Sequence, residues 1–345
     1  MSELVFHSYK PEQVTFLLNK YHGDLLSVLE KESKLRSGAY YGDMLSIEEK
    51  PEAEYTAIFD RILERNAVKI APYFLHLSEM INNARQDELT LVSLARAGTP
   101  VGVIITEILR NKFDREVNHY SVSAIHKYGV DGYAMKYLLE NHSPESLTFL
   151  DGWVSQGRIT RTLVETLKDQ PRIDPSLFCI SDPSGIQNAI ATREDILLPS
   201  AILNATVSGL VSRTVNNNDG YHFAASYEDQ ADVDRSQVFV EKVVAEVMKL
   251  DKANIGELLD HKLQRPLAVK QISDWCEKYN TTADNIKAGI GEVSRSLLRR
   301  DPRFVMVDED SVDQADHMFY LAQKRNIKLV VEKLDGPYKA FSILN

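Results

Sequence analysis

Two stretches of the chain pass in the same way from a short apolar run through a polar turn into a helical repeat. In residues 147–163 (LTFLDGWVSQGRITRTL) the apolar run ends at Asp151 and leads through Gly157 into a new helical pattern. Residues 89–98 (LTLVSLARAG) repeat this order, and the helix-like VGVIITEILRNKF follows. Each stretch predicts a strand, a loop and a helix, which is the repeating unit of an open α/β sheet.

The pattern on either side of these stretches predicts two further parts. Residues 1–83 show helical periodicity, as in YKPEQVTFLLNK and AEYTAIFDRILERNAVKIAPYFLHLSEMI, and we expect this region to pack on the sheet. Residues 84–255 hold the sheet itself. Residues 256–345 contain a strand (FVMV), a helix (SVDQADHMFYLAQKR) and two more strands (IKLVVEKL and YKAFSIL). They predict a second, smaller α/β domain.

Polar residues at the ends of the two apolar runs predict a site for an anion. Ligands of open α/β sheets bind at the carboxyl ends of the strands, and the backbone amides of a tight turn favour negative charge. Arg96 follows one run, and Asp151 with a Gly-bearing turn follows the other. Together with a bound metal ion they would neutralise a diphosphate.

These motifs resemble the type I phosphoribosyltransferase fold, in the variant found in bacterial stress-response and tellurium-resistance gene clusters. Residues 95–99 look like the pyrophosphate loop of that family, and residues 150–160 look like its ribose-phosphate loop. Residues 119–142 take the place of its mobile loop, and residues 191–215 are also similar. The resemblance implies an enzyme that uses phosphoribosyl diphosphate and Mg²⁺ to convert an unknown small acceptor into a nucleoside-like metabolite.

The resemblance also assigns roles to individual residues. Arg96 would stabilise the leaving diphosphate, Asp151 would orient the ribose and bind the metal, and the loop at Lys127 would close over the substrate. The other candidates for substrate binding are Ala97, Gly98, Thr99, Gly152, Ser155, Gln156, Gly157, Arg158, Thr160, Arg193 and Arg213. The ribose loop of the family carries two adjacent acidic residues, whereas Gly152 follows Asp151 here. This departure leaves open a non-catalytic protein that senses a nucleotide and binds RNA.

Basic side chains gather around a Gly-x-Gly turn and one predicted helix in residues 285–307. This region resembles the Pelota-type RNA-binding domain, which is fused to the same transferase family. The resemblance implies RNA contacts, because a Gly turn lets backbone amides approach phosphates and Arg supplies planar donors. The residues concerned are Gly289, Gly291, Arg295, Arg299 and Arg300. The alternative is an ordinary helix start with solvated arginines.

The two cysteines, Cys179 and Cys276, are too few for a disulfide framework or a Cys-rich metal site. Some members of the family carry the label of a cysteine protease, StiP, so a cysteine protease is a further alternative. A thiol protease needs a His partner and a third group that orients it. No His stands in a sequence context that marks it as the partner of Cys179, and we expect Cys179 to be a small strand residue.

Composition favours a globular cytoplasmic protein. The 345 residues are 43% apolar and 26% charged, and the formal net charge of −10 argues against a general nucleic-acid coat. No segment is long and apolar enough to span a membrane, and the start MSELVFHSYK lacks the features of a secretion signal. The resemblance adds other enzymes of a stress-response operon as partners, and a homo-oligomer is left open.

Overall fold

A seven-stranded sheet lies at the centre of the computed structural model, which describes residues 3–255 and 260–344. Its order is β1-β4-β3-β6-β7-β8, with all of these pairs parallel, and β5 adds an antiparallel pair to β4. The strands are β1 (Thr15–Phe16), β3 (Thr90–Ala95), β4 (Asn118–Ile125), β5 (Gly129–Val130), β6 (Leu147–Trp153), β7 (Leu177–Ser181) and β8 (Ile190–Thr192). The predicted mixed α/β class with a parallel central sheet is confirmed.

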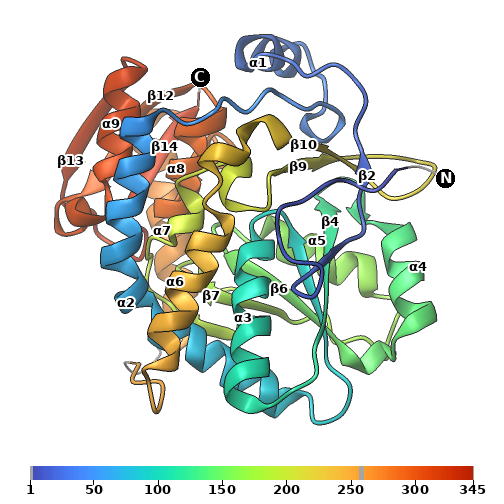
Figure 1. Cartoon of the computed structure of the whole chain (residues 1–345). Helices are drawn as coiled ribbons and strands as arrows, with labels where there is room; N and C mark the ends of the chain where they lie inside the picture. Colours follow the sequence, from blue (N-terminus) through green and yellow to red (C-terminus); the bar gives the residue numbers. More distant parts are fainter. Residues whose placement is uncertain (1–2, 256–259, 345) are drawn as a thin grey trace.

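Helices cover both faces of this sheet (Figure 1). One face packs against α2 (Ala53–Ala84), α3 (Gly98–Phe113) and α6 (Ser236–Met248), and the other packs against α4 (Gly132–Asn141) and α5 (Arg158–Leu167). Neighbouring strand residues alternate between the two layers, because Leu91 belongs to the first buried cluster and Val92 to the second. Double coverage explains why the predicted strands read as continuous apolar runs.

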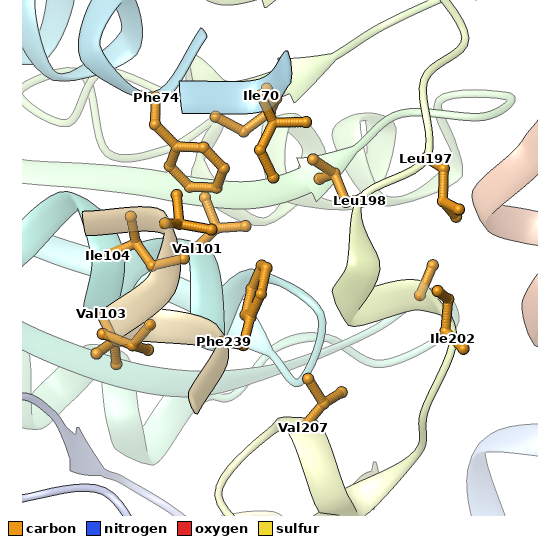
Figure 2. Packing of buried hydrophobic residues seen from close by; sticks show 14 of the residues in the cluster. Ile70, Phe74, Val101, Val103, Ile104, Leu197, Leu198, Ile202, Val207 and Phe239 are labelled. Carbon is orange, nitrogen blue, oxygen red and sulfur yellow. The ribbon is translucent and has the colours of Figure 1, made fainter. Parts of the chain in front are cut away.

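Figure 2 shows the buried cluster that joins the first helical layer to the sheet. Phe74 of α2, Ile104 of α3 and Phe239 of α6 meet in it, and all three side chains are fully buried. Leu197 and Leu198, which follow β8, lie in the same cluster. The cluster also contains Ile290 and other residues of the C-terminal part. One continuous apolar core therefore runs from the sheet into that part.

The stretch YKPEQVTFLLNK, which we expected to be helical, contains a turn at residues 11–13 and two short strands. Thr15 of β1 pairs with Tyr120 of the central sheet, and Asn19 of β2 (Asn19–Lys20) pairs with Phe223. The β2 strand thereby belongs to a small sheet of order β2-β10-β9, with β9 at Val211–Val215 and β10 at Phe223–Ser226. In the sequence, β2 is followed by α1 (Val28–Arg36) and the short 3-10 helix η1 (Tyr41–Asp43). Pairing with partners far along the chain overrides the local helical pattern here.

The C-terminal part has its own four-stranded sheet, of order β11-β14-β12-β13. Its strands are β11 (Ile286–Ala288), β12 (Pro302–Asp308), β13 (Lys328–Glu332) and β14 (Ala340–Leu344). Residues of α8 (Ile290–Arg299) and α9 (Asp316–Lys324) share one buried cluster with it, and residues of α7 (His261–Tyr279) share another. The predicted strand, helix and two further strands are confirmed. The predicted domain start at residue 256 lies outside the described residues.

Short 3-10 helices complete the described chain. They are η2 (Pro144–Ser146), η3 (Pro199–Ala201), η4 (Ala205–Val207), η5 (Glu228–Val233) and η6 (Glu309–Gln314). Three of them, η3, η4 and η5, lie in the long connection between β8 and α6. This connection carries Asn204, which lies beside the site described next.

Candidate functional site

A cleft opens at the carboxyl ends of β3, β4 and β6, with helix α8 as its opposite wall. It consists of two adjoining cavities of about 330 and 260 Å³. The residues that line both cavities are Tyr41, His126, Asp151, Ile159 and Arg295. The sheet, the η1 segment and the C-terminal part therefore each contribute to one site.

Glycines bring two helix starts to the edge of this cleft. A Cβ atom at Gly98 would lie 2.5 Å from the carbonyl oxygen of Leu150, so only glycine lets α3 begin this close to β6. Gly157 has a φ of 72° and directly precedes α5. Ala97 lines the smaller cavity, and Gly157 lines the larger one. The two strand, loop and helix units predicted from sequence are confirmed, and their helix N-termini lie at the cleft.

Basic side chains dominate the cleft wall. Those that line it are Arg96, Arg158, Arg213, Lys287, Arg295 and Arg299, whereas the carboxylates that line it are Asp151 and Glu292. In the part of the chain that the structure describes, no carboxylate lies within 4.0 Å of Arg213, Lys287 or Arg299. Burial, followed by the charge of Arg96, lowers the pKa of Arg299 to about 9. Positive charge in the cleft is therefore in excess and poorly solvated.

Arg96 has an internal partner that the sequence did not reveal. Its guanidinium donates to the carboxylate of Glu48 at 2.5 Å and to the carbonyl oxygen of Val211 at 2.9 Å, and both charged side chains are buried. It also donates to Asn204 Oδ1 at 3.1 Å, and that same oxygen accepts a hydrogen bond from Arg299 Nε at 2.6 Å. Arg96 thus anchors the segment after η1 to the end of β3, and it shares the acceptor Asn204 with Arg299.

Tyr41 stands among cations at the mouth of both cavities. The guanidinium carbon of Arg213 lies 3.9 Å from the centre of its ring, and Lys31 Nζ and the guanidinium carbon of Arg300 lie 5.5 and 5.8 Å from it. Burial acts to raise the pKa of this phenol, but the charges of Arg213, Lys31 and Arg299 outweigh it and lower the pKa to about 8. A phenol of this kind is a proton donor or acceptor near neutral pH.

We expect one tyrosine to ionise with a pKa near 8 in the ultraviolet absorbance of the folded protein, and Tyr41→Phe to remove that transition. Arg213→Ala removes the largest stabilising charge and should move the transition to higher pH. Tyr40→Phe is the matched control, because it deletes the neighbouring hydroxyl and should leave the transition in place. A transition that survives Tyr41→Phe would show that the ionising group is elsewhere.

Asp151 lines both cavities of the cleft. Its Oδ1 accepts the backbone N–H of Gly152 at 2.7 Å, and burial raises the pKa of its carboxyl to about 6, although Arg295 opposes the rise. Within residues 3–255 and 260–344, no group of three or more His, Cys, Asp or Glu side chains is placed to hold a metal ion. A Mg²⁺ ion that shares phosphate oxygens needs only one or two protein carboxylates, and Asp151 and Glu292 line the larger cavity.

Two of the residues predicted to bind RNA, Arg295 and Arg299, line the cleft. Arg295 lies over the ring of Trp153, with its guanidinium carbon 4.3 Å from the ring centre, and Arg300 pairs with Glu32 at 2.6 Å. A Cβ atom at Gly291 would lie 2.5 Å from the same Trp153 ring. Together with the contact of Arg299 to Asn204, these positions turn the basic side of α8 toward the sheet. The helix does not present its arginines as a separate outer face.

Several predicted substrate residues instead connect the two parts of the molecule. Ser155 Oγ donates to the carbonyl oxygen of Ala288 at 2.6 Å, Gln156 Nε2 donates to that of Ile286 at 2.9 Å, and Arg158 pairs with Asp284. Their backbone and side chains also line the larger cavity. They hold the β6–α5 loop against β11 at the cleft wall.

A buried carboxylate strengthens the same interface. Both oxygens of Asp195 accept the N–H of Ile290 at the start of α8, at 3.0 and 3.1 Å, and one accepts the N–H of Lys339 at 2.8 Å. A Cβ at Gly289 would lie 3.3 Å from the Asp195 carboxylate. Gly289 is therefore placed for packing against the helix cap, and Asp195 fixes the position of α8.

The other predicted residues are spread over several environments. Lys127 is exposed on the β4–β5 turn, where its Nζ lies 5.0 Å from the centre of the Tyr40 ring. Thr99 is buried and shares a hydrogen bond with Ser121 at 2.7 Å. Arg193 pairs with the buried Asp182 at 3.3 Å. The cavity linings include none of Lys127, Thr99 and Arg193, whereas they include Thr160 and Arg213.

The residues of the site that were not among the sequence candidates include Tyr41, Glu48, His126 and Trp153. The Gly and aromatic cluster SGAYYGDML around Tyr41 was visible in the sequence, but nothing in it indicated contact with α8. Trp153 is the last residue of β6, and only the folded structure shows that the guanidinium group of Arg295 lies over its ring. These residues come together through contacts between distant parts of the chain.

Neither cysteine is placed as a reactive thiol. Cys179 lies in the middle of β7, is fully buried, and is paired in the sheet with Asp151 and Ile190. Burial raises the pKa of its thiol well above the usual range, and Asp151 and Asp182 add to the rise. Cys276 on α7 is partly exposed, and burial raises the pKa of its thiol also. A nucleophilic thiol needs a lowered pKa.

No described helix is both long enough and apolar enough to cross a membrane. The fold and the cleft define a mixed α/β protein with a cation-rich site between a parallel sheet and a small C-terminal unit. Residues 7–244 match the family model described as "Tellurite-like stress resistance cysteine protease StiP", and the chain belongs to this StiP family. Residues 267–345 match the model described as "PELOTA RNA binding domain".

The chain is similar over its length to a curated relative. A protein named cysteine protease StiP, from Acinetobacter baylyi (strain ATCC 33305 / BD413 / ADP1), is 28% identical over 359 residues, which cover 98% of this chain and 93% of the relative. A solved structure of a hypothetical protein from Neisseria gonorrhoeae with bound ppGpp covers 50% of this chain and 91% of its own, at 12% identity. Its TM-score of 0.22 is too low to carry an argument.

These comparisons overturn the predicted activity. The family and the relative are named as a cysteine protease, which is a hydrolase, so the prediction of a phosphoribosyltransferase that uses phosphoribosyl diphosphate was wrong. The alternative of a cysteine protease agrees better with the family name. The expected tellurium and stress-resistance family and the Pelota-type domain are confirmed by the two family descriptions.

Proposed function

We propose that the cleft between the sheet and α8 binds a ligand that carries phosphate groups. The observation that supports this proposal is the set of cleft cations, Arg213, Lys287 and Arg299, with no carboxylate within 4.0 Å in the described part of the chain. Some other cations of the molecule do pair with a carboxylate, as Lys242 does with Glu64. An anionic ligand would supply the missing negative charge.

Physical chemistry favours a phosphate over a carboxylate ligand. Arg presents a planar set of donors that matches a phosphate, and charge-assisted bonds of this kind are stronger in a poorly solvated site. The N-termini of α3 and α5 add backbone N–H groups and the positive ends of their dipoles at the same edge. Two adjoining cavities of about 330 and 260 Å³ leave space for a phosphate and an attached organic group.

The partners expected from the sequence fit this site to different degrees. We propose that RNA is the macromolecular ligand of residues 267–345, because that segment matches a model described as RNA-binding. A magnesium ion would be held by Asp151 or Glu292 together with phosphate oxygens of the ligand. The finer assignment of the sheet to the phosphoribosyltransferase type is a proposal about the fold alone, supported by the two strand, loop and helix units.

Calorimetric titration with inorganic tripolyphosphate tests the proposal. We expect binding by the wild-type protein and a loss of at least about tenfold in affinity for Arg299→Ala, since one charge-assisted contact is removed from a buried site. Arg172→Ala is the matched control, because Arg172 is exposed and pairs with Glu145. Glu145 precedes the start of β6, at the opposite end of this strand from the cleft. Equal loss in both variants would indicate non-specific attraction and would contradict the proposal. Repeating the titration with Mg²⁺ tests the metal.

A cysteine-dependent hydrolase is the second candidate function, and the name of the family favours it. The chain has two cysteines, so one of them must carry any such activity. Cys179 would have to leave a fully buried position in β7 before it could attack a substrate. Cys276 is the more accessible of the two, although burial raises the pKa of its thiol.

The double variant Cys179→Ala and Cys276→Ser tests the two functions separately. If peptidase activity is found with a casein or peptide-library substrate, a cysteine mechanism requires the double variant to lose it completely. The phosphate-binding proposal predicts that the same variant keeps its affinity for tripolyphosphate, because neither cysteine lines the cleft. Peptidase activity that survives the double substitution would exclude both cysteines as nucleophiles.

A further inference from the structure

The basic side of α8 and the strand-end cleft form one site. Arg295 and Arg299 come from the segment that matches the RNA-binding model, and both line cavities whose other walls come from the central sheet. Arg295 is held against Trp153 of β6, and Arg299 is held by Asn204. An RNA that contacts these arginines must therefore enter the cleft.

The outer surface of the C-terminal segment offers few other cations. Most of its basic side chains have acidic partners: Lys270 with Asp274, Lys278 with Glu332, Lys324 with Glu52, Lys333 with Asp310 and Lys339 with Asp308. Arg303 and Lys328 lie exposed on neighbouring strands β12 and β13. If RNA bound the outer face of this segment and not the cleft, it would bind at Arg303 and Lys328.

The size and charge of the cleft favour the end of a strand. Cavities of about 330 and 260 Å³ are of the size of small-molecule sites, too small for a duplex groove contact. An internal phosphodiester carries a single charge, whereas a terminal phosphate monoester carries about −1.5 to −2 and three acceptor oxygens. The smaller cavity is lined by Arg213 and Arg299. The larger has the apolar Val154 and Ile159 beside Lys287.

We propose that the cleft takes the phosphorylated end of a single-stranded RNA, with the terminal phosphate between Arg213 and Arg299 and the adjoining nucleoside in the larger cavity. This inference rests on the proposed phosphate-binding function and specifies its ligand. Both parts of the molecule contact the RNA at once. The Gly-x-Gly turn contributes by placing α8 against the sheet.

Fluorescence anisotropy with a short single-stranded RNA tests the proposal. The same oligonucleotide is compared with a 5′-phosphate, with a 3′-phosphate and with hydroxyl groups at both ends. We expect one phosphorylated form to bind at least about tenfold more tightly than the hydroxyl form, and Arg299→Ala or Arg213→Ala to abolish this difference. Arg303→Ala is the matched control, because it deletes an exposed arginine of the same segment and should keep the difference.

Each other result contradicts the proposal in a defined way. Equal affinity for all three oligonucleotides, or a difference that depends on Arg303 and not on Arg299, would place RNA on the outer surface. Adenosine monophosphate that binds as tightly as the phosphorylated oligonucleotide would show that the ligand is a free nucleotide. Binding of tripolyphosphate without discrimination between RNA ends would overturn this inference and leave the proposed phosphate site intact. Thermal melting of each variant identifies any loss of folding.

Discussion

Glu48→Ala is expected to lower the free energy of unfolding by roughly 3–5 kcal/mol, because it leaves the Arg96 guanidinium buried without its partner. Glu48 accepts hydrogen bonds from Arg96 at 2.5 Å and from the N–H of Ala205 at 3.0 Å, and its side chain is almost fully buried. Despite burial, Arg96 and Arg299 hold the pKa of this carboxyl below its usual value. Urea denaturation of the wild type and variant measures the loss.

Two comparisons make this prediction specific. Lys50 lies two residues after Glu48 and forms an exposed ion pair with Asp232. Lys50→Ala removes this pair and should lower the free energy of unfolding by only about 0–1 kcal/mol. The double variant Arg96→Met and Glu48→Leu should recover much of the loss, since apolar side chains of similar size remove the buried charges together. A single Glu48→Ala variant as stable as Lys50→Ala would show that the pair is exposed to water in solution.

Asp195→Ala is expected to lower the free energy of unfolding by roughly 3 kcal/mol and to loosen α8 from the sheet. The substitution leaves the buried N–H of Ile290 and the partly buried N–H of Lys339 without an acceptor, and a buried N–H without a partner costs about 1–3 kcal/mol. Asp195 lies on the segment after β8, and its partners lie in the C-terminal unit. The lost hydrogen bonds are therefore those that join α8 and the C-terminal sheet to the central part of the molecule. Denaturation measures its size, and proteolysis of α8 under native conditions measures the loosening.

Asp284→Ala is the matched control, because it removes the exposed partner of Arg158 across the same interface and should cost about 0–1 kcal/mol. The pH dependence adds a second readout. Burial raises the pKa of Asp195 to about 7, although the N–H groups of Lys339 and Ile290 oppose this. Since an unfolded Asp titrates near ~3.9, its contribution to stability falls as the pH rises between about 4 and 7. Asp195→Asn should flatten that part of the profile, and an unchanged slope would contradict the assignment.

Local patterns allowed much of the fold to be predicted. The strand, loop and helix units at residues 89–113 and 147–163 are each continuous in sequence, and their apolar runs, Gly turns and helical repeats are local signals. The C-terminal strands and α9 were predicted for the same reason, because each is defined by a local pattern of apolar residues. The strands β1 and β2 were missed, because their partners in β4 and β10 lie roughly a hundred or more residues further along the chain.

The site could be predicted only in part. Asp151 lies in the cleft because it stands near the carboxyl end of β6 in a parallel sheet, and ligands of such sheets bind at the carboxyl ends of the strands. The partner of Arg96 could not be predicted, since Glu48 reaches it from another part of the chain. The spacing of Arg295 and Arg299 places both on one side of a helix, but only the packing of Gly291 against Trp153 shows which neighbour that side meets.

The predicted transferase activity was the largest error. It arose because the pattern at the strand ends indicates an anion site but does not specify a reaction. A strand end with Arg and another with Asp predict an anion site, and such a site serves many reactions on this class of fold. The resemblance supplied the transferase reaction, and the family name contradicts it. The structure shows a cation-rich cleft at these strand ends, lined by Arg213, Lys287 and Arg299.

A crystal structure of the wild-type protein grown with inorganic tripolyphosphate tests the phosphate-binding claim most directly. The account predicts an anion in the smaller cavity, within hydrogen-bond distance of the guanidinium groups of Arg213 and Arg299, with Asn204 still holding Arg299 in place. Tripolyphosphate bound only to exposed basic side chains outside the cleft, with both arginines free of it, would contradict the account.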